Sequence, residues 1–156
     1  MGSENHDIQL ATFTLGENLF AVDIMRIREI ILPQNLSALP GASQILEGVI
    51  NLRGSVLPVI DLRRRLGLVS VGRSDGQRVM VFLIKGIRTG FIVDSVAEVL
   101  RIQKSSIETA PRLSSEQSTL LSRMANLEKQ KRMVQLIEPS HLLGGSDLSA
   151  LADLAA

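Results

Sequence analysis

Short runs of apolar and β-branched residues, separated by turn residues, extend along most of the chain. This pattern is typical of β-strands and differs from the 3.6-residue period of long amphipathic helices. The sharpest example covers residues 47–62, where two apolar runs meet at Arg53-Gly54. Glycine adopts the positive φ that a tight hairpin turn needs, so this segment is predicted to be a strand, a turn and a strand. Because Pro58 has no N–H to donate, the second strand should have an open side at that residue, at a sheet edge or at a bulge.

The same criteria predict strands and hairpins on both sides of this central hairpin. The expected strands cover residues 8–15, 19–24, 25–32, 78–84, 90–94, 96–102, 124–127 and 132–137. Short helical segments are expected at residues 43–46, 62–66, 139–143 and 148–154, and one more from Ser114 within a polar loop at 104–122. The predicted fold class is therefore all-β with short helices, one of them at the C-terminus.

The two halves of the chain share a weak internal repeat. Residues 13–31 align with residues 82–100, and each stretch begins with Phe, contains a turn glycine and ends a strand with Val-Asp. A repeat of about seventy residues is too long for a solenoid unit and is typical of two similar small β-barrels. Chance similarity between two hairpins is the alternative. The expected joint between the halves lies near 68–77, and the central hairpin has no aligned counterpart in the second half.

Length and composition indicate one globular domain. With 156 residues, of which 45% are apolar and 21% charged, the chain is long enough to bury a core. We expect a flexible N-terminus at 1–7, a single domain at 8–143 whose late strands at 124–138 complete the barrels, and a tail or short helix at 144–156. The net charge of +1 predicts no attraction to nucleic acid. The absence of cysteine is consistent with a reducing cytosol, and neither a signal peptide nor an apolar run of roughly 20 residues for membrane insertion is present.

Few side chains in the sequence are arranged for catalysis or metal binding. The two histidines are far apart along the chain, so we expect no metal site, no Ser/His/Asp triad and no cofactor. Asp23, Asp61 and Asp94 each follow Val or Ile at a predicted strand end, where capping or turn formation accounts for them. The three arginines at 63–65 are more typical of a solvated helix face than of a phosphate clamp. These features indicate a binding module rather than an enzyme.

Several motifs in a fixed order resemble those of the CheW family of chemotaxis adaptors. The motifs are IREI at 27–30, Leu39-Pro40, EGVINLRG at 47–54, LPVIDL at 57–62 and the Val-Asp pair at 93–94 followed by residues 96–100. The resemblance covers residues 8–143. The last hairpin departs from the family pattern, because its tip at 128–131 lacks glycine and Glu138 stands where the family often has aspartate.

The resemblance implies a fold of two intertwined five-stranded barrels of the SH3-like or OB-like type. It also implies a non-catalytic scaffold that couples chemoreceptors to the CheA histidine kinase in a bacterial chemotaxis array. The expected partners are the cytoplasmic signalling tip of the receptor and the regulatory domain of CheA. The expected location is the cytoplasm beside membrane-bound receptor arrays, with a monomer in isolation. The alternatives are a CheW-like module of a larger kinase or of a receiver-fused adaptor, or an adaptor for a non-flagellar behaviour.

Two partner surfaces follow from the same resemblance. The receptor's helical hairpin tip is expected to dock in a groove between the barrels, near Ile27, Glu29, Ile30 and Arg53, and the kinase is expected to contact Val56. A pair of amphipathic helices needs apolar anchors, which suits the isoleucines, and charges that fix its register, which suits the other two residues. Core burial is the alternative for the isoleucines. A structural ion pair or an exposed charge is the alternative for the charged residues.

Overall fold

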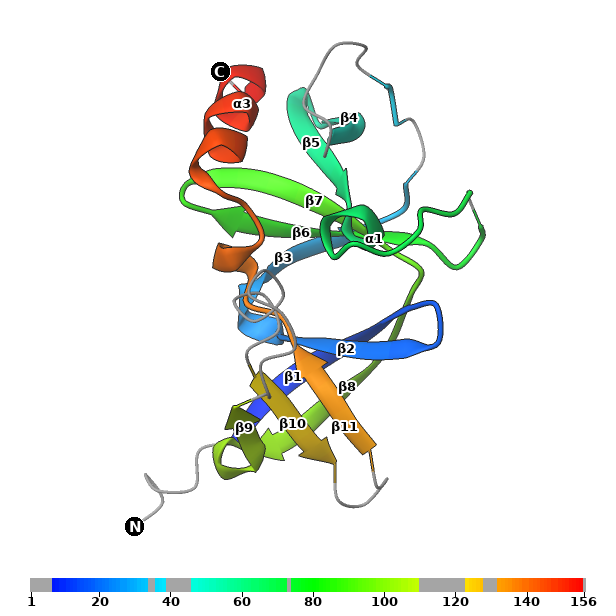
Figure 1. Ribbon diagram of the computed structural model, residues 1–156. Coiled ribbons are helices and arrows are strands. Elements are labelled where there is room, and N and C mark those ends of the chain that lie inside the picture. The colour runs from blue at the N-terminus through cyan, green and yellow to red at the C-terminus, as the bar shows by residue number, and fades with distance from the viewer. Residues whose placement is uncertain are drawn as a thin grey trace.

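The computed structural model describes residues 7–33, 36–38, 46–72, 74–109, 123–127 and 132–155. Within these residues, eleven strands form a six-stranded sheet, sheet A, and a five-stranded sheet, sheet B (Figure 1). Sheet A contains, in spatial order, β8 (Ser95–Gln103), β1 (Asp7–Leu15), β2 (Asn18–Asp23), β11 (Arg132–Leu136), β10 (Arg123–Leu127) and β9 (Ile107–Thr109). Sheet B contains β3 (Ile27–Ile31), β6 (Arg78–Ile84), β7 (Ile87–Val93), β5 (Ser55–Asp61) and β4 (Leu46–Leu52).

Short helical segments connect or cover the sheets. They are η2 (Ile24–Arg26), α1 (Leu62–Arg65), η3 (Lys104–Ser106), η5 (Pro139–His141) and the C-terminal helix α3 (Gly145–Ala155). The end of the chain was expected to be a tail or a short helix, and it is helical over eleven residues. In the described part of the chain, no helix has the length and apolar character to cross a membrane.

Each repeat contributes strands to both sheets. The first repeat places β1 and β2 in sheet A but β3, β4 and β5 in sheet B. The second repeat does the reverse, with β6 and β7 in sheet B but β8, β10 and β11 in sheet A. As a result, β3 pairs with β6 and β8 pairs with β1. The two units are intertwined through this exchange, and the segment at 68–77 separates the repeats but not the sheets.

The central hairpin has a structural counterpart that the sequence comparison missed. In sheet B, β5 lies parallel to β7, and in sheet A, β11 lies parallel to β2. The hairpins β4–β5 and β10–β11 therefore occupy equivalent places in the two repeats. The expectation that the central hairpin is unique to the first repeat was wrong, because unrelated apolar sequences fill the same position. The tip of the second hairpin, at 128–131, lies outside the described residues.

Sheet A has a sixth strand in a segment that was predicted to be a loop. Strand β9 pairs with β10 over three residues, and Ile107 packs against a small apolar cluster of this sheet. The helix predicted from Ser114 lies outside the described residues. So does most of the helical turn predicted at 43–46, although Leu46 itself begins a strand, β4.

Tight two-residue turns close two hairpins of sheet B. Both residues of the Arg53-Gly54 turn have positive φ, 51° and 85°, and so do both residues of the Lys85-Gly86 turn, at 48° and 84°. Positive φ at both positions matches the right-handed twist of the flanking strands. The second turn was predicted to extend over 85–89, but β7 already begins at Ile87.

The main core lies between the sheets and is built from equivalent residues of the two repeats. Phe13 stacks on Phe20 in sheet A with ring centroids 5.8 Å apart, and Phe82 lies 5.8 Å from Phe91 in sheet B. These pairs join one buried apolar cluster, on which the leucines of α3 also pack. A separate apolar cluster lies on the other face of sheet B; it includes Val81, and its buried members are at most 5% exposed.

Candidate functional site

Glu29, Arg53 and Arg88 form one ion cluster on sheet B. Arg53 Nη1 and Nη2 donate hydrogen bonds to Glu29 Oε1 and Oε2 at 3.2 and 2.7 Å. Arg88 Nη2 donates a third, also to Oε2, at 2.9 Å. The hydrogen bonds from Arg53, together with the charges of both guanidiniums, hold the pKa of Glu29 below its ordinary value. Two cations share one carboxylate, so the cluster has a net charge of +1.

Three strands bring these side chains together from distant parts of the chain. Glu29 lies on β3, Arg53 at the tip of the β4–β5 hairpin and Arg88 on β7. The side chains of Arg53, Arg88 and Glu29 are 66%, 43% and 23% exposed. Exposed ion pairs add little to stability. The ion pair that was the alternative interpretation of these two residues therefore exists, and it is accessible to solvent.

Ile27 and Ile30 lie on the other face of sheet B from Glu29. Glu29 pairs with Val81 of the separate buried cluster, whereas both isoleucines pair with β6 residues that belong to the main core. Residues directly opposite each other in an antiparallel pair have their side chains on the same face. Ile27 is half-buried against the main core, and Ile30 is 43% exposed. The expected apolar anchors, Ile27 and Ile30, and the expected charge on the same strand, Glu29, thus lie on opposite faces of β3.

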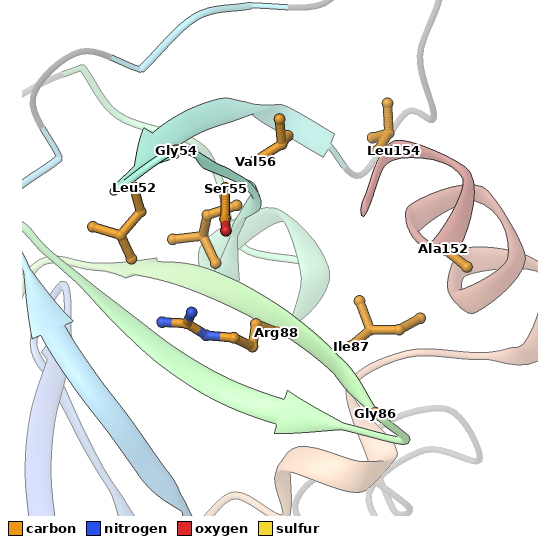
Figure 2. A pocket seen from close by; sticks show the side chains of 10 residues that line it. Leu52, Gly54, Ser55, Val56, Gly86, Ile87, Arg88, Ala152 and Leu154 are labelled. Atoms are coloured by element: carbon orange, nitrogen blue, oxygen red, sulfur yellow. The ribbon is translucent and has the colours of Figure 1, made fainter. Parts of the chain in front are cut away.

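Val56 lines a cavity of about 510 Å³ between the starts of β5 and β7 (Figure 2). The cavity is lined by Leu52, Gly54, Ser55, Val56, Leu57, Gly86, Ile87 and Arg88, and by Ala152 and Leu154 of α3. The side chain of Val56 is on the surface, with 46% of the residue exposed. Arg88 belongs both to the ion cluster and to the wall of this cavity.

Pro58 is the reason that β5 and β7 are incompletely paired. Their parallel pairing begins only at Val59 and Gly90, although both strands begin earlier. Val49 lies opposite Pro58, but its backbone N–H and C=O bond to Ser37, each at 2.8 Å. Val49 and Pro58 are therefore a non-hydrogen-bonded pair, and the backbone of Pro58 faces β7 instead of β4. Pro58 has no N–H to offer there, and the ladder stops. The open side predicted from the sequence is therefore present inside the sheet, not at its edge.

A second ion pair connects the two sheets. Arg63 Nε donates to Asp94 Oδ1 at 2.9 Å, Arg63 Nη2 donates to Asp94 Oδ2, and Gly16 N donates to the same Oδ2 at 2.6 Å. Gly16 lies in the β1–β2 turn of sheet A, whereas Arg63 lies on α1 beside sheet B. The hydrogen bonds from Arg63 lower the pKa of Asp94. The prediction of a solvated face was wrong for Arg63, whose side chain is only 16% exposed.

The other strand-end carboxylates cap short helices, as predicted for two of them. Asp23 caps η2 and Asp61 caps α1 through hydrogen bonds of 2.9 and 3.1 Å from backbone N–H groups. Glu138 caps η5 in the equivalent place after β11, with Ser140 N at 3.0 Å, and it pairs with Arg26 at 2.6 Å. Asp23, Asp61 and Glu138 therefore have structural roles as helix caps. Among the described residues, no cluster of three or more His, Cys, Asp or Glu could hold a metal ion.

Comparison with known proteins identifies the family. A family model described as a CheW-like domain matches residues 9–146. The chain belongs to the CheW family. It is 34% identical over 144 residues to a probable chemotaxis protein CheW of Rhizobium etli, with 92% of each chain covered. It is 31% identical over 148 residues to the chemotaxis protein CheW of Bacillus subtilis, with 94% of each covered.

A solved CheW structure has the same fold. The crystal structure of scaffolding protein TtCheW from Thermoanaerobacter tengcongensis superimposes with a TM-score of 0.82 at 30% identity, covering 91% of this chain and 97% of that one. The expected fold class is confirmed. Members of the CheW family are chemotaxis coupling scaffolds rather than enzymes, and this chain is a scaffold of that kind.

Sequence reasoning missed two parts of the site in this CheW family member. Arg88 was assigned to a turn at 85–89, so its place on β7 beside Glu29 was not foreseen. The Lys85-Gly86 pair was an available signal, because it has the form of a two-residue hairpin turn and places Arg88 on a strand. The contribution of α3 to the cavity had no signal in the local pattern.

Proposed function

We propose that this CheW scaffold links the cytoplasmic signalling tip of a chemoreceptor to the regulatory domain of CheA, in the cytoplasm beside membrane-bound receptor arrays. In isolation the chain is a monomer. The observation that carries the proposal is the Glu29–Arg53–Arg88 cluster, in which the side chains of all three members reach solvent next to exposed apolar residues. Such a surface recognises a partner by charge and buries apolar side chains on contact.

The open edge of β3 is the receptor surface in this proposal. Among the described residues, β3 is the last strand of sheet B and pairs with β6 alone. A helical hairpin lying along this edge reaches both faces of the strand, where it meets Ile27 and Ile30 on one side and Glu29 on the other. Arg53 lies within hydrogen-bonding distance of Glu29 and completes the charged side. The placement of apolar anchors and charges on opposite faces is thereby compatible with a single partner.

The kinase surface in this proposal is centred on Val56. This residue is exposed and lies on β5 at the cavity between β5 and β7. The two proposed surfaces adjoin at the tip of the central hairpin, because Arg53 and Arg88 both contact Glu29 and Arg88 also lines the cavity beside Val56.

Charge reversal at Arg53 tests the receptor surface. We expect Arg53→Glu to weaken binding to a receptor signalling fragment by about tenfold or more, since it removes charged hydrogen bonds and introduces repulsion. The melting temperature should change by no more than about 2 °C, because the side chain is largely exposed. Arg101→Glu, the same charge change on β8 of sheet A, is the matched control. Unchanged receptor binding, or a fall in melting temperature beyond about 5 °C, would show that Arg53 is structural or unrelated to docking.

A further inference from the structure

The cavity between β5, β7 and α3 combines an apolar wall with one charged group. Its volume of about 510 Å³ falls within the range of about 300 to 1,000 Å³ typical of ligand sites. Leucine, valine and isoleucine side chains of the two strands form most of the wall, and Leu154 of α3 closes one end. Arg88 is the charged side chain among the described lining residues, and in Figure 2 its guanidinium lies on the side of the cavity away from α3.

The Arg88 guanidinium uses few of its hydrogen-bond donors among the described residues. A guanidinium has five N–H donors, and among the described residues Arg88 donates one side-chain hydrogen bond, to Glu29. Glu29 receives two more from Arg53, so its charge is divided between two cations. The cavity therefore complements a carboxylate next to an apolar group.

The backbone around Arg88 also favours an extended occupant. Arg88 and Gly90 alternate along β7, so both present their backbone groups toward β5. The next donor of that ladder would be the N–H of residue 58, and proline lacks it. The Arg88 carbonyl, which lies where the cavity begins, therefore has no N–H donor on β5 and can accept a hydrogen bond from another group. An N–H of an extended partner segment can supply it.

We propose that this cavity receives a short extended segment of the CheA regulatory domain, which inserts an apolar side chain and places a neighbouring carboxylate on Arg88. The choice of partner rests on the proposed function, because Val56 lines both the cavity and the kinase surface. The inference adds Arg88 and the C-terminal helix to that surface. It also specifies the chemistry of the kinase segment, which is acidic and apolar rather than basic.

Two variants test the charge and the volume separately. Arg88→Gln removes the cation and keeps the length of the side chain, and Arg88→Lys restores the charge. Ala152→Leu fills the cavity from the exposed face of α3, and Ser149→Leu enlarges an exposed residue of the same helix that does not line the cavity. Each variant is titrated with purified CheA and, separately, with a receptor signalling fragment, at low and high salt, after its melting temperature is checked.

The expected result is a loss of CheA affinity of about tenfold for Arg88→Gln, the usual effect of losing one charged hydrogen bond, with recovery by lysine. The salt dependence of CheA binding should also decrease in Arg88→Gln. Ala152→Leu should weaken CheA binding while the Ser149→Leu control does not, and receptor binding should persist in both variants of α3.

Three results would overturn the inference. CheA binding that survives both Arg88→Gln and Ala152→Leu, in a protein that binds CheA normally, would show that the cavity is unused while leaving the proposed function intact. A loss of receptor binding alone in Arg88→Gln would show that Arg88 acts only through Glu29. A wild-type chain that binds no CheA would remove the proposed function, and the inference with it.

Discussion

Replacing Asp94 by asparagine should destabilise the fold by about 2 kcal/mol, because it removes the charge that binds the two sheets together. Asp94 accepts two hydrogen bonds from Arg63 and one from Gly16 N. A hydrogen bond to a charged group contributes about 1.5–3 kcal/mol, and an exposed ion pair about 0–1 kcal/mol. The Arg63 and Asp94 side chains are 16% and 21% exposed, so an intermediate value is appropriate.

The effect is measurable as a shift of the melting temperature. For a chain of this length, 1 kcal/mol corresponds to about 2–4 °C, so Asp94→Asn should melt about 4–8 °C lower at pH 7. Circular dichroism is the suitable probe, because the chain has neither Trp nor Tyr. Glu29→Gln is the matched control. The Glu29 side chain is 23% exposed, but its partners Arg53 and Arg88 are 66% and 43% exposed against 16% for Arg63, so the melting temperature should change by about 2 °C at most.

The pH dependence of the melting temperature checks independently that the ionised Asp94 carboxylate stabilises the fold. The pKa of Asp94 is lower in the folded state than in the unfolded chain, because Arg63 stabilises the carboxylate. Its contribution to stability is fully present above the ordinary aspartate pKa of about 3.9 and is lost as the pH falls through the folded value. The difference between wild type and Asp94→Asn should therefore shrink at acid pH. A difference below about 1 °C at pH 7, or one that grows on acidification, would refute the reasoning.

Two further substitutions test buried positions by denaturant unfolding. Thr12 is fully buried at a register shift between β1 and β8, and its Oγ1 donates to Glu98 O at 2.7 Å and accepts from Glu98 N at 2.9 Å. Thr12→Val should cost about 1–3 kcal/mol and Thr12→Ser much less, and equal losses would show that the hydroxyl is unimportant. A Cβ at Gly90 would lie 2.5 Å from Val79 Cγ1, so Gly90→Ala should cost about 1–3 kcal/mol. Adding Val79→Ala should recover part of that loss, and no recovery would indicate strain elsewhere.

The strands were predictable because each is specified by its own residues. β-branched runs and turn glycines at Gly16, Gly54 and Gly86 are local signals, and all three glycines have positive φ in the structure. The caps formed by Asp23 and Asp61 were predictable for the same reason, since the capped amides lie two residues further along the chain.

Contacts between residues that are far apart in the sequence could not be predicted from the local sequence pattern. Asp94 looked like another strand-end cap, but its partner Arg63 is 31 positions away and was interpreted as solvated. Strand β9 has only three residues and is defined by its pairing with β10 rather than by its composition. The counterpart of the central hairpin went unrecognised for a related reason, because a position in a sheet can be filled by many apolar sequences.

The exchange of strands between repeats explains why the partner surfaces depend on the whole chain. Glu29 and Arg53 come from the first repeat, but Arg88, which shares the same carboxylate oxygen, comes from the second. They meet only because the chain leaves sheet A after β2 and β3 pairs with β6 of the other repeat. A single repeat would lack half of each sheet and would leave Glu29 without Arg88.

The Arg63–Asp94–Gly16 contact stabilises the same exchange of strands at another place, since it joins the β1–β2 turn of sheet A to the end of β7 in sheet B. Changes at this contact should therefore affect receptor and kinase binding together, whereas changes at Arg53 or Ala152 should separate them.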